Sequence, residues 1–452
     1  MRRSILAVSV AALLAAAPAL ADQRFPATLM GHAILPAYTT IAAPADAPLA
    51  FAVSGKFAGP GNTRNERMLS VPGMSGMGAG ARPTGLSFPF QGQPVQGYSG
   101  IKRIGDGSYW TLTDNGFGSK ANSADAMLMF HRIRPNFQTG AVERMETIFL
   151  HDPDRLVPFP IVAEGTAKRY LTGADFDLES FQPIGDSFWF GEEFGPYLIR
   201  ADRQGKVTGV WATELGGRPV RSPDQPAVRT PGAPGGAVDF NLGRSRGYEG
   251  MAASPDGRML YAMLEGPVFV DGRAEAENGR EFLRVIEFDV AAARWTGRSF
   301  RYPLEINGNA IGDFNMIDAT RALVIERDNA EGDPAQACPA NAPAPTCFAA
   351  PARFKRVYVV SFEGVADGGA LRKLGHIDLM DIADPQNRAR QGGANGKLTF
   401  PFFTIENVDV VDAEHIIVGN DNNLPFSAGR FLTRADDNEL ILLRVPELLN
   451  AR

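Results

Sequence analysis

The sequence predicts an all-β protein, a single β-propeller of five or six four-stranded blades. A hairpin pattern with a polar or acidic residue at each open end occurs five times along the 452 residues. Two further strand-like runs follow the hairpin in most copies, and no long amphipathic helix interrupts them. Because an internal repeat determines architecture more strongly than local propensity does, these observations favour one repetitive domain over two or three unrelated ones.

Residues 248–266 show the repeated hairpin most clearly. Two short apolar runs flank Ser254-Pro255-Asp256-Gly257, in which Pro and Gly supply the backbone angles of a tight turn. Glu249 and Glu265 stand at the open end, where an antiparallel hairpin brings its first and last residues together. The five copies begin and end in the same way, at Ser99 and Asp114, Glu179 and Glu192-Glu193, Glu249 and Glu265, Gly312-Asp313 and Glu326, and Glu406-Asn407 and Asn420-Asp421.

The two ends of the chain are expected to close the ring. The fifth copy has a single outer strand, 439–445, and the alternating segment 49–57 is its expected partner. The N-terminal segment, 22–98, also contains a long Gly- and Pro-rich loop, and the propeller spans 99–446. Insertions on the blades are expected near 152–177, 215–247 and 331–352. The alternative fold, a pair of all-β sandwiches, does not explain the recurrent acids.

Residues 1–21 have the features of a cleaved signal peptide, because a positive start is followed by an apolar run and an Ala-x-Ala site. We expect a mature protein that is periplasmic or secreted, with no stable membrane insertion. The net charge of −6 becomes −8 when Arg2 and Arg3 are removed, and no run of Lys and Arg occurs. A nucleic-acid partner is therefore not expected, and nothing in the sequence implies a partner protein.

The chain has two cysteines, Cys338 and Cys347, in a Pro- and Ala-rich loop. In an exported protein this pair is expected to form a disulfide that holds the insertion together, without a catalytic role. Two cysteines with no neighbouring pair of histidines do not make a zinc site.

The acidic residues of the repeats are expected to meet around one rim of the channel, since both ends of each hairpin lie on that face. Carboxylates this close together raise each other's pKa unless a cation compensates them. Oxygen ligands in this number favour Ca²⁺, with another divalent cation as the alternative. The competing interpretation is solvated loop acids or salt bridges between blades. The expected metal ligands are Glu179, Glu249, Glu406, Asn407, Asp114, Glu326 and Asp421.

Basic residues near this rim would serve an anionic substrate. Arg327 follows an acidic exit, and Lys102 follows the first strand entry. The planar fork of Arg suits phosphate or carboxylate oxygens, although Arg327 would equally neutralise its acidic neighbours. The sequence has no Gly-x-Ser-x-Gly elbow and no Gly-rich phosphate loop, which argues against a serine esterase and against a nucleotide-binding loop.

Five short motifs carry a resemblance to a known family: Tyr98-Ser99-Gly100-Ile101, Asp177-Leu178-Glu179-Ser180, Gly191-Glu192-Glu193-Phe194-Gly195, Tyr248-Glu249-Gly250-Met251 and Ile325-Glu326-Arg327-Asp328. They resemble bacterial exported proteins with the phytase-like domain, described as having esterase-like activity of phytase. The resemblance covers about 99–446 and implies a β-propeller and metal-assisted phosphoester hydrolysis. The fourth repeat has Gly312 where other copies have Glu, so the ligand ring departs from strict symmetry.

The expected function is that of an exported Ca²⁺-dependent phosphoesterase acting on a small anionic substrate. The metal would bind a phosphate oxygen and lower the pKa of a bound water. Glu249 and Glu193 are the expected catalytic carboxylates, and Arg327 and Lys102 would balance the phosphate charge. A gluconolactonase-like lactone or carboxylester hydrolase is the alternative enzyme, and a non-catalytic ligand-binding propeller is the alternative from another class.

Overall fold

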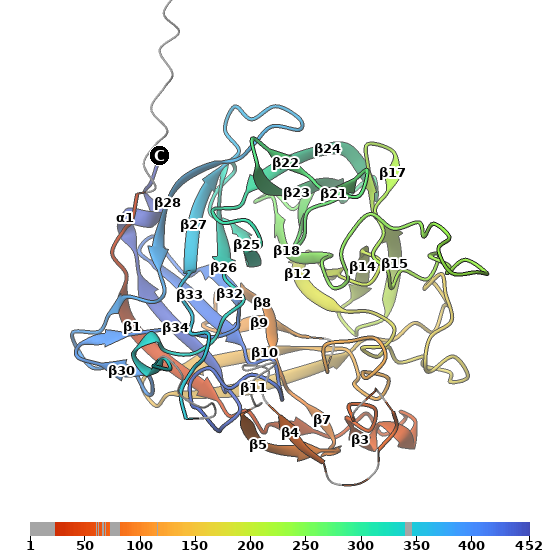
Figure 1. Ribbon diagram of the computed structural model, residues 1–452, viewed down its shortest axis with the longest axis horizontal. Helices are drawn as coiled ribbons and strands as arrows, with labels where there is room; N and C mark the ends of the chain where they lie inside the picture. The colour runs from red at the N-terminus through yellow and green to blue at the C-terminus, as the bar shows by residue number, and fades with distance from the viewer. Residues whose placement is uncertain are drawn as a thin grey trace, which may run out of the picture.

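The computed structural model describes residues 23–452 except 60, 62, 66, 68, 73–81, 115 and 340–345. Within this part of the chain, four-stranded antiparallel units surround a central axis, which confirms the predicted β-propeller (Figure 1). From the inside outward, the five units are β8 (Tyr98–Arg103), β9 (Tyr109–Thr113), β10 (Met129–Asn136) and β11 (Ala141–Phe149); β12 (Leu178–Ile184), β13 (Ser187–Glu192), β14 (Tyr197–Asp202) and β15 (Val207–Ala212); β18 (Tyr248–Ala253), β19 (Met259–Leu264), β23 (Arg280–Asp289) and β24 (Arg294–Pro303); β25 (Ala310–Met316), β26 (Arg321–Arg327), β27 (Lys355–Ser361) and β28 (Arg372–Asp378); and β32 (Thr404–Val410), β33 (His415–Asp421), β34 (Asn438–Arg444) and β1 (Thr28–Leu35). We call these units blades 1 to 5.

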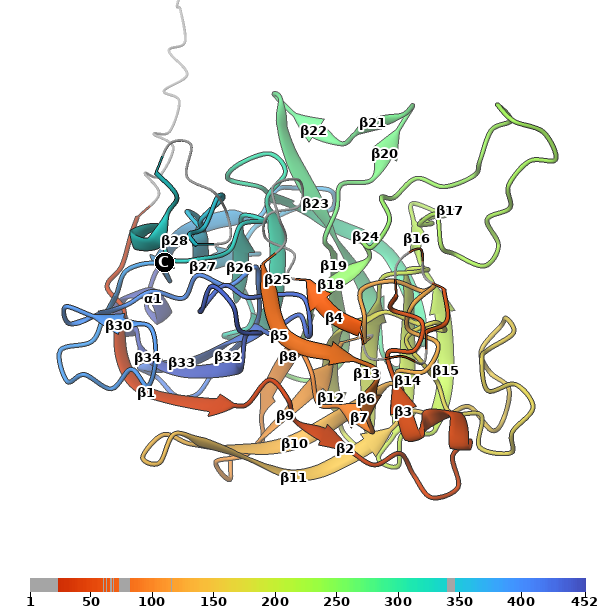
Figure 2. The same ribbon diagram turned by 60° about the horizontal axis from the view of Figure 1, so that its bottom comes forward.

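The ring is closed by the two ends of the chain, as the sequence predicts. The innermost strands contact one another in the cyclic order β8, β12, β18, β25 and β32, and β32 contacts β8 again. The N-terminal strand β1 pairs antiparallel with β34 and so completes blade 5 (Figure 2).

The position predicted for the closing strand, 49–57, is wrong. Leu49–Ala52 forms a 3-10 helix, and Val53–Ser54 is a two-residue strand, β3, that pairs with β6 (Phe90–Gln91). Gly55 then has φ of +83°, so the backbone leaves the extended conformation before the predicted strand would end. The strand that closes the ring is β1, which lies upstream of 49–57. Buried and partly buried residues alternate along only part of β1.

In most blades an aspartate at the hairpin turn accepts a backbone hydrogen bond. Asp106 accepts a hydrogen bond from the Ser108 amide in blade 1, and Asp256 accepts one from the Arg258 amide in blade 3. Asp318 and Asp412 accept backbone amides in blades 4 and 5 in the same manner. Such side-chain bonds fix the reversal of the chain. In blade 2, Asp186 pairs instead with the Arg203 side chain.

The core consists of apolar layers between neighbouring blades. Phe130 of blade 1 and Phe188 of blade 2 are buried with ring centroids 4.5 Å apart, and Trp189 of blade 2 packs on Phe288 of blade 3 at 5.4 Å. The inner strands lie between neighbouring blades and are buried at most positions, whereas outer strands such as β11 are largely exposed. This packing positions the inner strands around the axis.

Short elements outside the blades cover one side of the ring and project from it (Figure 2). The insertion with the cysteines is held by the predicted Cys338–Cys347 disulfide, and it contacts the N-terminal segment through a 2.7 Å pair between Arg82 and Glu331. The remaining elements are β2 (Thr40–Ile41), β4 (Leu69–Pro72), β5 (Pro83–Phe88), β7 (Gln93–Pro94), β16 (Glu214–Leu215), β17 (Arg218–Pro219), β20 (Phe269–Val270), β21 (Arg273–Ala274), β22 (Ala276–Glu277), β29 (Ile382–Ala383), β30 (Gly393–Ala394), β31 (Lys397–Leu398), the 3-10 helix Pro334–Gln336 and α1 (Pro446–Leu449).

Among the described residues, no helix combines the length and apolar character needed to cross a membrane. The predicted signal peptide, 1–21, lies outside the described residues.

Candidate functional site

Every inner strand carries a β-bulge near its start, at the polar position that the repeat shares. The register between the first and second strands shifts there in all five blades. A bulge leaves one residue out of the ladder and redirects its side chain. The bulges place Glu179, Glu249 and Glu406 toward the axis, whereas the same position holds Ser99 in blade 1 and Gly312 in blade 4.

A second set of side chains comes from the ends of the second strands. In each blade, the residue just before the bulge pairs with a residue of the second strand, for example Leu178 with Glu192 or Tyr248 with Leu264. The next residue along the second strand faces the axis. Each blade therefore contributes one residue to this exit ring. Its members are Asp114, Glu193, Glu265, Arg327 and Asp421.

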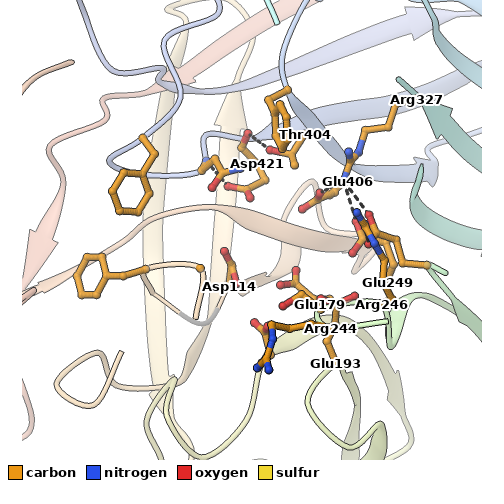
Figure 3. A pocket seen from close by; sticks show the side chains of 18 residues that line it. Asp114, Glu179, Glu193, Arg244, Arg246, Glu249, Arg327, Thr404, Glu406 and Asp421 are labelled. Carbon is orange, nitrogen blue, oxygen red and sulfur yellow. Dashed lines mark hydrogen bonds and ion pairs between the residues drawn. The ribbon is translucent and has the colours of Figure 1, made fainter. Parts of the chain in front are cut away.

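Together these side chains line a cavity of about 500 Å³ at one end of the channel. Figure 3 shows the labelled acids pointing toward a shared space, with Arg244 apart from Arg327. Arg246 and Arg327 both contact Glu265. The lining has eight carboxylates, three arginines and three phenylalanines. The carboxylates are Asp114, Asp177, Glu179, Glu193, Glu249, Glu265, Glu406 and Asp421.

One group of acids combines Asp114 with Asp177 and Glu179, and their nearest carboxylate oxygens lie within 4.8 Å of one another. Asp177 is buried, and its Oδ1 has no hydrogen-bond partner among the described residues. A buried carboxylate oxygen without a partner is costly unless a cation or a proton compensates it. An oxygen-only group of this spacing could hold a hard divalent cation.

A second group consists of Glu193, Glu249 and Glu265, again with oxygens within 4.8 Å of one another. This second group contacts arginines. Nη2 of Arg327 lies 3.3 Å from Glu265 and 3.6 Å from Glu249, and Arg246 forms an ion pair with Glu265. The second group is thus compensated by the protein itself.

The pKa shifts follow this distribution of charge. Burial, and then repulsion from Asp114, raises the pKa of both Asp177 and Glu179 well above the ordinary values. Burial also raises the pKa of Glu249, followed by repulsion from Glu406, but here the Arg327 cation acts in the opposite direction. Among the described residues of this cavity, the charge at Asp177 and Glu179 is therefore the least compensated, and a cation would relieve it.

Three of the predicted site residues do not line the cavity. Glu326 precedes the cavity-facing Arg327, and since neighbouring strand residues face opposite sides, its carboxylate accepts the Tyr302 hydroxyl at 2.8 Å and Lys373 at 2.7 Å. Asn407 follows the Glu406 bulge and donates to the Tyr98 carbonyl, which ties blade 5 to blade 1.

The third is Lys102, which lies near the other end of β8. Its Nζ lies 2.8 Å from Asp409 and 3.0 Å from the Asn315 side chain, away from the acidic cavity. Asn315 also receives a 2.9 Å hydrogen bond from Gln182 and donates one to the Val408 carbonyl at 2.8 Å. Lys102 thus belongs to a polar plug that joins several blades, defined here as Lys102, Asn315, Asp409 and Gln182.

The other predicted residues do line the cavity: Glu179, Glu249, Glu406, Asp114, Asp421, Glu193 and Arg327. Sequence reasoning did not assign Asp177, which stands two residues before a bulge, outside the shared repeat position. The sequence pattern placed Glu265 among the acids of the rim without a role. The Asp-x-Glu spacing of Asp177 and Glu179 is the sequence feature that could have identified Asp177 as a site residue.

The fold and this cavity define a β-propeller with a carboxylate-lined central site. A family model described as "Phytase-like: Esterase-like activity of phytase" matches residues 93–424, more than half of the chain. The chain belongs to this phytase-like family. The description of the family implies a hydrolase.

A curated relative, described as an uncharacterized secreted protein of Arthroderma benhamiae, is 26% identical over 241 residues. The match covers 42% of this chain and 46% of the relative, so the chain spans about half the length of that protein. Because this relative is fungal, the bacterial origin named in the resemblance stays a prediction.

Solved structures share less with the chain. The Dos1 propeller is 10% identical with a TM-score of 0.31, and the match covers 79% of this chain and 70% of that one. An exo-1,5-alpha-L-arabinanase from a bovine ruminal metagenomic library is 9% identical with a TM-score of 0.34, over 77% and 92% of the two chains. At these TM-scores the likeness carries no argument.

Proposed function

We propose that the protein is an exported, divalent-cation-dependent hydrolase of phosphoesters, with Ca²⁺ as the cation. The observation that supports this most is the convergence of eight carboxylates and three arginines on one cavity of about 500 Å³. Buried acids in this number need a cation, and arginines beside them suit an anionic substrate. The family description and the secreted relative agree with a hydrolase that leaves the cell.

The proposed cation ligands are Asp114, Asp177 and Glu179. Their oxygens are close enough to share one ion, and Asp177 Oδ1 is buried without a hydrogen-bond partner in the described part of the chain. Ca²⁺ accepts irregular carboxylate sets, with water completing its shell. When bound, such an ion polarises a phosphoryl oxygen and lowers the pKa of a water molecule.

The arginines would bind the phosphate group and orient it. Arg246 is partly exposed and pairs with Glu265, and Arg244 is exposed and pairs with Asp224, so both lie where solvent reaches the cavity. Arg327 is buried and holds Glu249, Glu265 and Glu406 in place. Its role would be to fix these acids, with phosphate binding left mainly to Arg244 and Arg246.

Glu249 and Glu193 are the proposed proton acceptors for an attacking water. Both are buried, and burial raises the pKa of each well above that of an ordinary glutamate. A carboxylate with a raised pKa is a stronger base when it is ionised. One oxygen of Glu193 has no hydrogen-bond partner among the described residues, which leaves it available for a proton.

A lactone or carboxylester hydrolase of the gluconolactonase-like kind is the alternative. A neutral lactone would make no use of Arg244 and Arg246, whereas a phosphoester would use both. The arginines are therefore the feature that favours the phosphoester. A propeller that only binds a ligand would share the cation site and show no turnover.

The test is hydrolysis of a chromogenic phosphomonoester, a phosphodiester and an aliphatic lactone by purified mature protein. Each substrate is assayed after chelation and again after Ca²⁺ addition. We expect one phosphoester class to be hydrolysed, with activity lost in chelator and restored by Ca²⁺. Glu179→Gln should remove the Ca²⁺ response, and the exposed Glu143→Gln serves as the matched control.

Preference for the lactone would replace the proposed function with the alternative enzyme. Calcium binding without turnover of any of the three substrates would support the binding propeller. Phosphoester hydrolysis that persists in chelator would contradict the role of the cation.

A further inference from the structure

The cavity has an apolar side that the proposed hydrolysis does not use. Phe117, Phe403 and Phe426 line it together with the acids, and we call these three residues the aromatic lining. Phe403 and Phe426 are partly exposed, while Phe117 is almost fully buried. Partly exposed phenyl rings inside a polar cavity cost free energy unless a ligand covers them.

The aromatic lining is built into the fold. Phe117 and Phe426 both pack on the buried Phe88, with ring centroids at 5.3 Å and 6.2 Å. Phe403 directly precedes β32, and the Arg327 guanidinium lies 5.8 Å from its ring centroid. Because these contacts fix the rings before a ligand arrives, a bound apolar group would meet a preformed surface.

The aromatic lining and the exposed arginines come from different blades. Phe117 follows β9 of blade 1, and Phe403 and Phe426 flank the hairpin β32–β33 of blade 5. Arg244 and Arg246 directly precede β18 of blade 3. In a closed ring of five units, the third lies across from the junction of the fifth and the first. A ligand that reaches both sides would therefore have one anionic end and one apolar end.

The charge of the lining argues against a substrate with many phosphates. Eight carboxylates face three arginines, and every one of these arginines already contacts a carboxylate. One divalent cation reduces the negative excess without removing it. A polyphosphorylated ligand would meet like charges at several points, which disfavours its binding.

Building on the proposed function, we propose that the substrate is a phosphoester with a single phosphate group and an aromatic or similarly flat apolar group. The phosphate would lie toward Arg244 and Arg246, and the apolar group would contact Phe403 and Phe426. A volume of about 500 Å³ falls within the range of pockets that enclose small-molecule ligands. Multiply phosphorylated inositols would be poor substrates.

The test compares kcat/KM for benzyl phosphate, ethyl phosphate and inositol hexakisphosphate with Ca²⁺ present. The first two esters release alkoxides of similar basicity, so their ratio reports contact with the ring. We expect benzyl phosphate to exceed ethyl phosphate by about tenfold or more, as for other apolar pockets, and to exceed the hexakisphosphate. If the protein hydrolyses only diesters, the methyl diesters of the first two replace them.

Two variants connect the preference to the aromatic lining. Phe426→Ala and Phe403→Ala should each reduce the benzyl-to-ethyl ratio by about tenfold. Phe269→Ala, at an exposed phenylalanine that does not line the cavity, should leave the ratio unchanged. Thermal unfolding shows whether each variant is folded. Calorimetric binding of benzylphosphonate and methylphosphonate to the unmodified protein supplies a readout that needs neither turnover nor a variant.

The outcomes separate this inference from the proposed function. Equal kcat/KM for benzyl and ethyl esters, or preference for the hexakisphosphate, would overturn the inference and leave the proposed function standing. Absence of phosphoester hydrolysis would overturn the proposed function, while tighter binding of benzylphosphonate than methylphosphonate would still support the aromatic lining as the ligand contact. Equal binding of the two phosphonates would overturn the inference in either case.

Discussion

Nη2 of Arg327 lies 3.0 Å from Oε1 of Glu406, a contact that joins the exit ring of blade 4 to the bulge of blade 5. The same nitrogen also contacts Glu249 and Glu265 of blade 3. All four side chains are nearly inaccessible to solvent, so one cation compensates three buried acids. Blade 4, which has Gly312 at the position of the bulge glutamates, thus supplies an arginine that holds acids of blades 3 and 5.

Replacing Arg327 with methionine should strongly destabilise the protein. The change leaves Glu249, Glu265 and Glu406 without their shared cation, and removing one partner from a buried ion pair costs about 3–5 kcal/mol. The measurement is the free energy of unfolding by urea near neutral pH. Arg203→Met, which breaks an exposed pair with Asp186, is the control and should change stability by less than about 0.5 kcal/mol. A loss of under about 1 kcal/mol for Arg327→Met would contradict this role of Arg327.

Asp177→Asn should separate cation binding from folding. With calcium at a hundred times its dissociation constant, the unmodified protein should gain about 2.7 kcal/mol. The variant should lose most of that gain, yet in chelator it should be at least as stable as the unmodified protein. The reason is that burial and repulsion from Asp114 raise the pKa of Asp177, so the amide relieves a destabilising charge.

Thermal unfolding during calcium titration measures both effects of Asp177→Asn. Asp186→Asn, at an exposed hairpin turn, is the matched control and should keep the full calcium response. An unchanged response in Asp177→Asn would exclude this group as the cation site.

The repeat predicts the propeller and most of the cavity, because hairpins with the same sequence pattern adopt equivalent places around an axis. Glu179, Glu249 and Glu406 share one repeat position, and the structure places all three in bulges that line the cavity. The fourth copy was aligned one residue out of register. Glu326 pairs with Ile311, the residue before the bulge, so the exit position falls on Arg327 and strand alternation turns Glu326 away.

The sequence could not predict which distant segments contact one another. The closing strand β1 is recognised only by its pairing with β34, about 400 residues later, since its own alternation is weak. Asp177 lies just before β12. It belongs to the site because the fold brings Asp114 of blade 1 close to it. Neither pairing leaves a local signal that could be read without the fold.

Ring closure should depend on acid pH through Glu439. This buried residue of β34 contacts Arg430 at 2.6 Å and His32 of β1 at 3.0 Å. Burial by itself would raise the pKa of Glu439, but Arg430 and His32 together hold it at about 2, below its ordinary 4.5. A depressed carboxylate pKa stabilises the folded state above the unfolded pKa. This contribution is lost as pH falls from about 4.5 through 2.

Glu439→Gln tests this contribution. The difference in unfolding free energy between the unmodified protein and the variant should shrink by about 3 kcal/mol as pH falls from 6 to 2, as expected for a shift of this size. Glu414→Gln, which removes an exposed partner of Arg444, is the control. A difference that stays constant across this range would mean that Glu439 does not titrate as described.

Lys102→Met should affect stability and leave catalysis intact, opposite to the role that the sequence predicts for it. Its Nζ contacts the nearly buried Asp409 and the Asn315 side chain in the polar plug, and it does not line the acidic cavity. Removing the ammonium leaves Asp409 with a weaker set of partners, which should cost about 1–3 kcal/mol. Denaturant unfolding measures this loss, and kcat/KM on the active phosphoester should stay within about twofold.

Glu249→Gln is the opposite case, with hydrolysis abolished and the fold retained. If a folded Lys102→Met protein lost its activity as Glu249→Gln does, the catalytic site would extend through the channel to the plug.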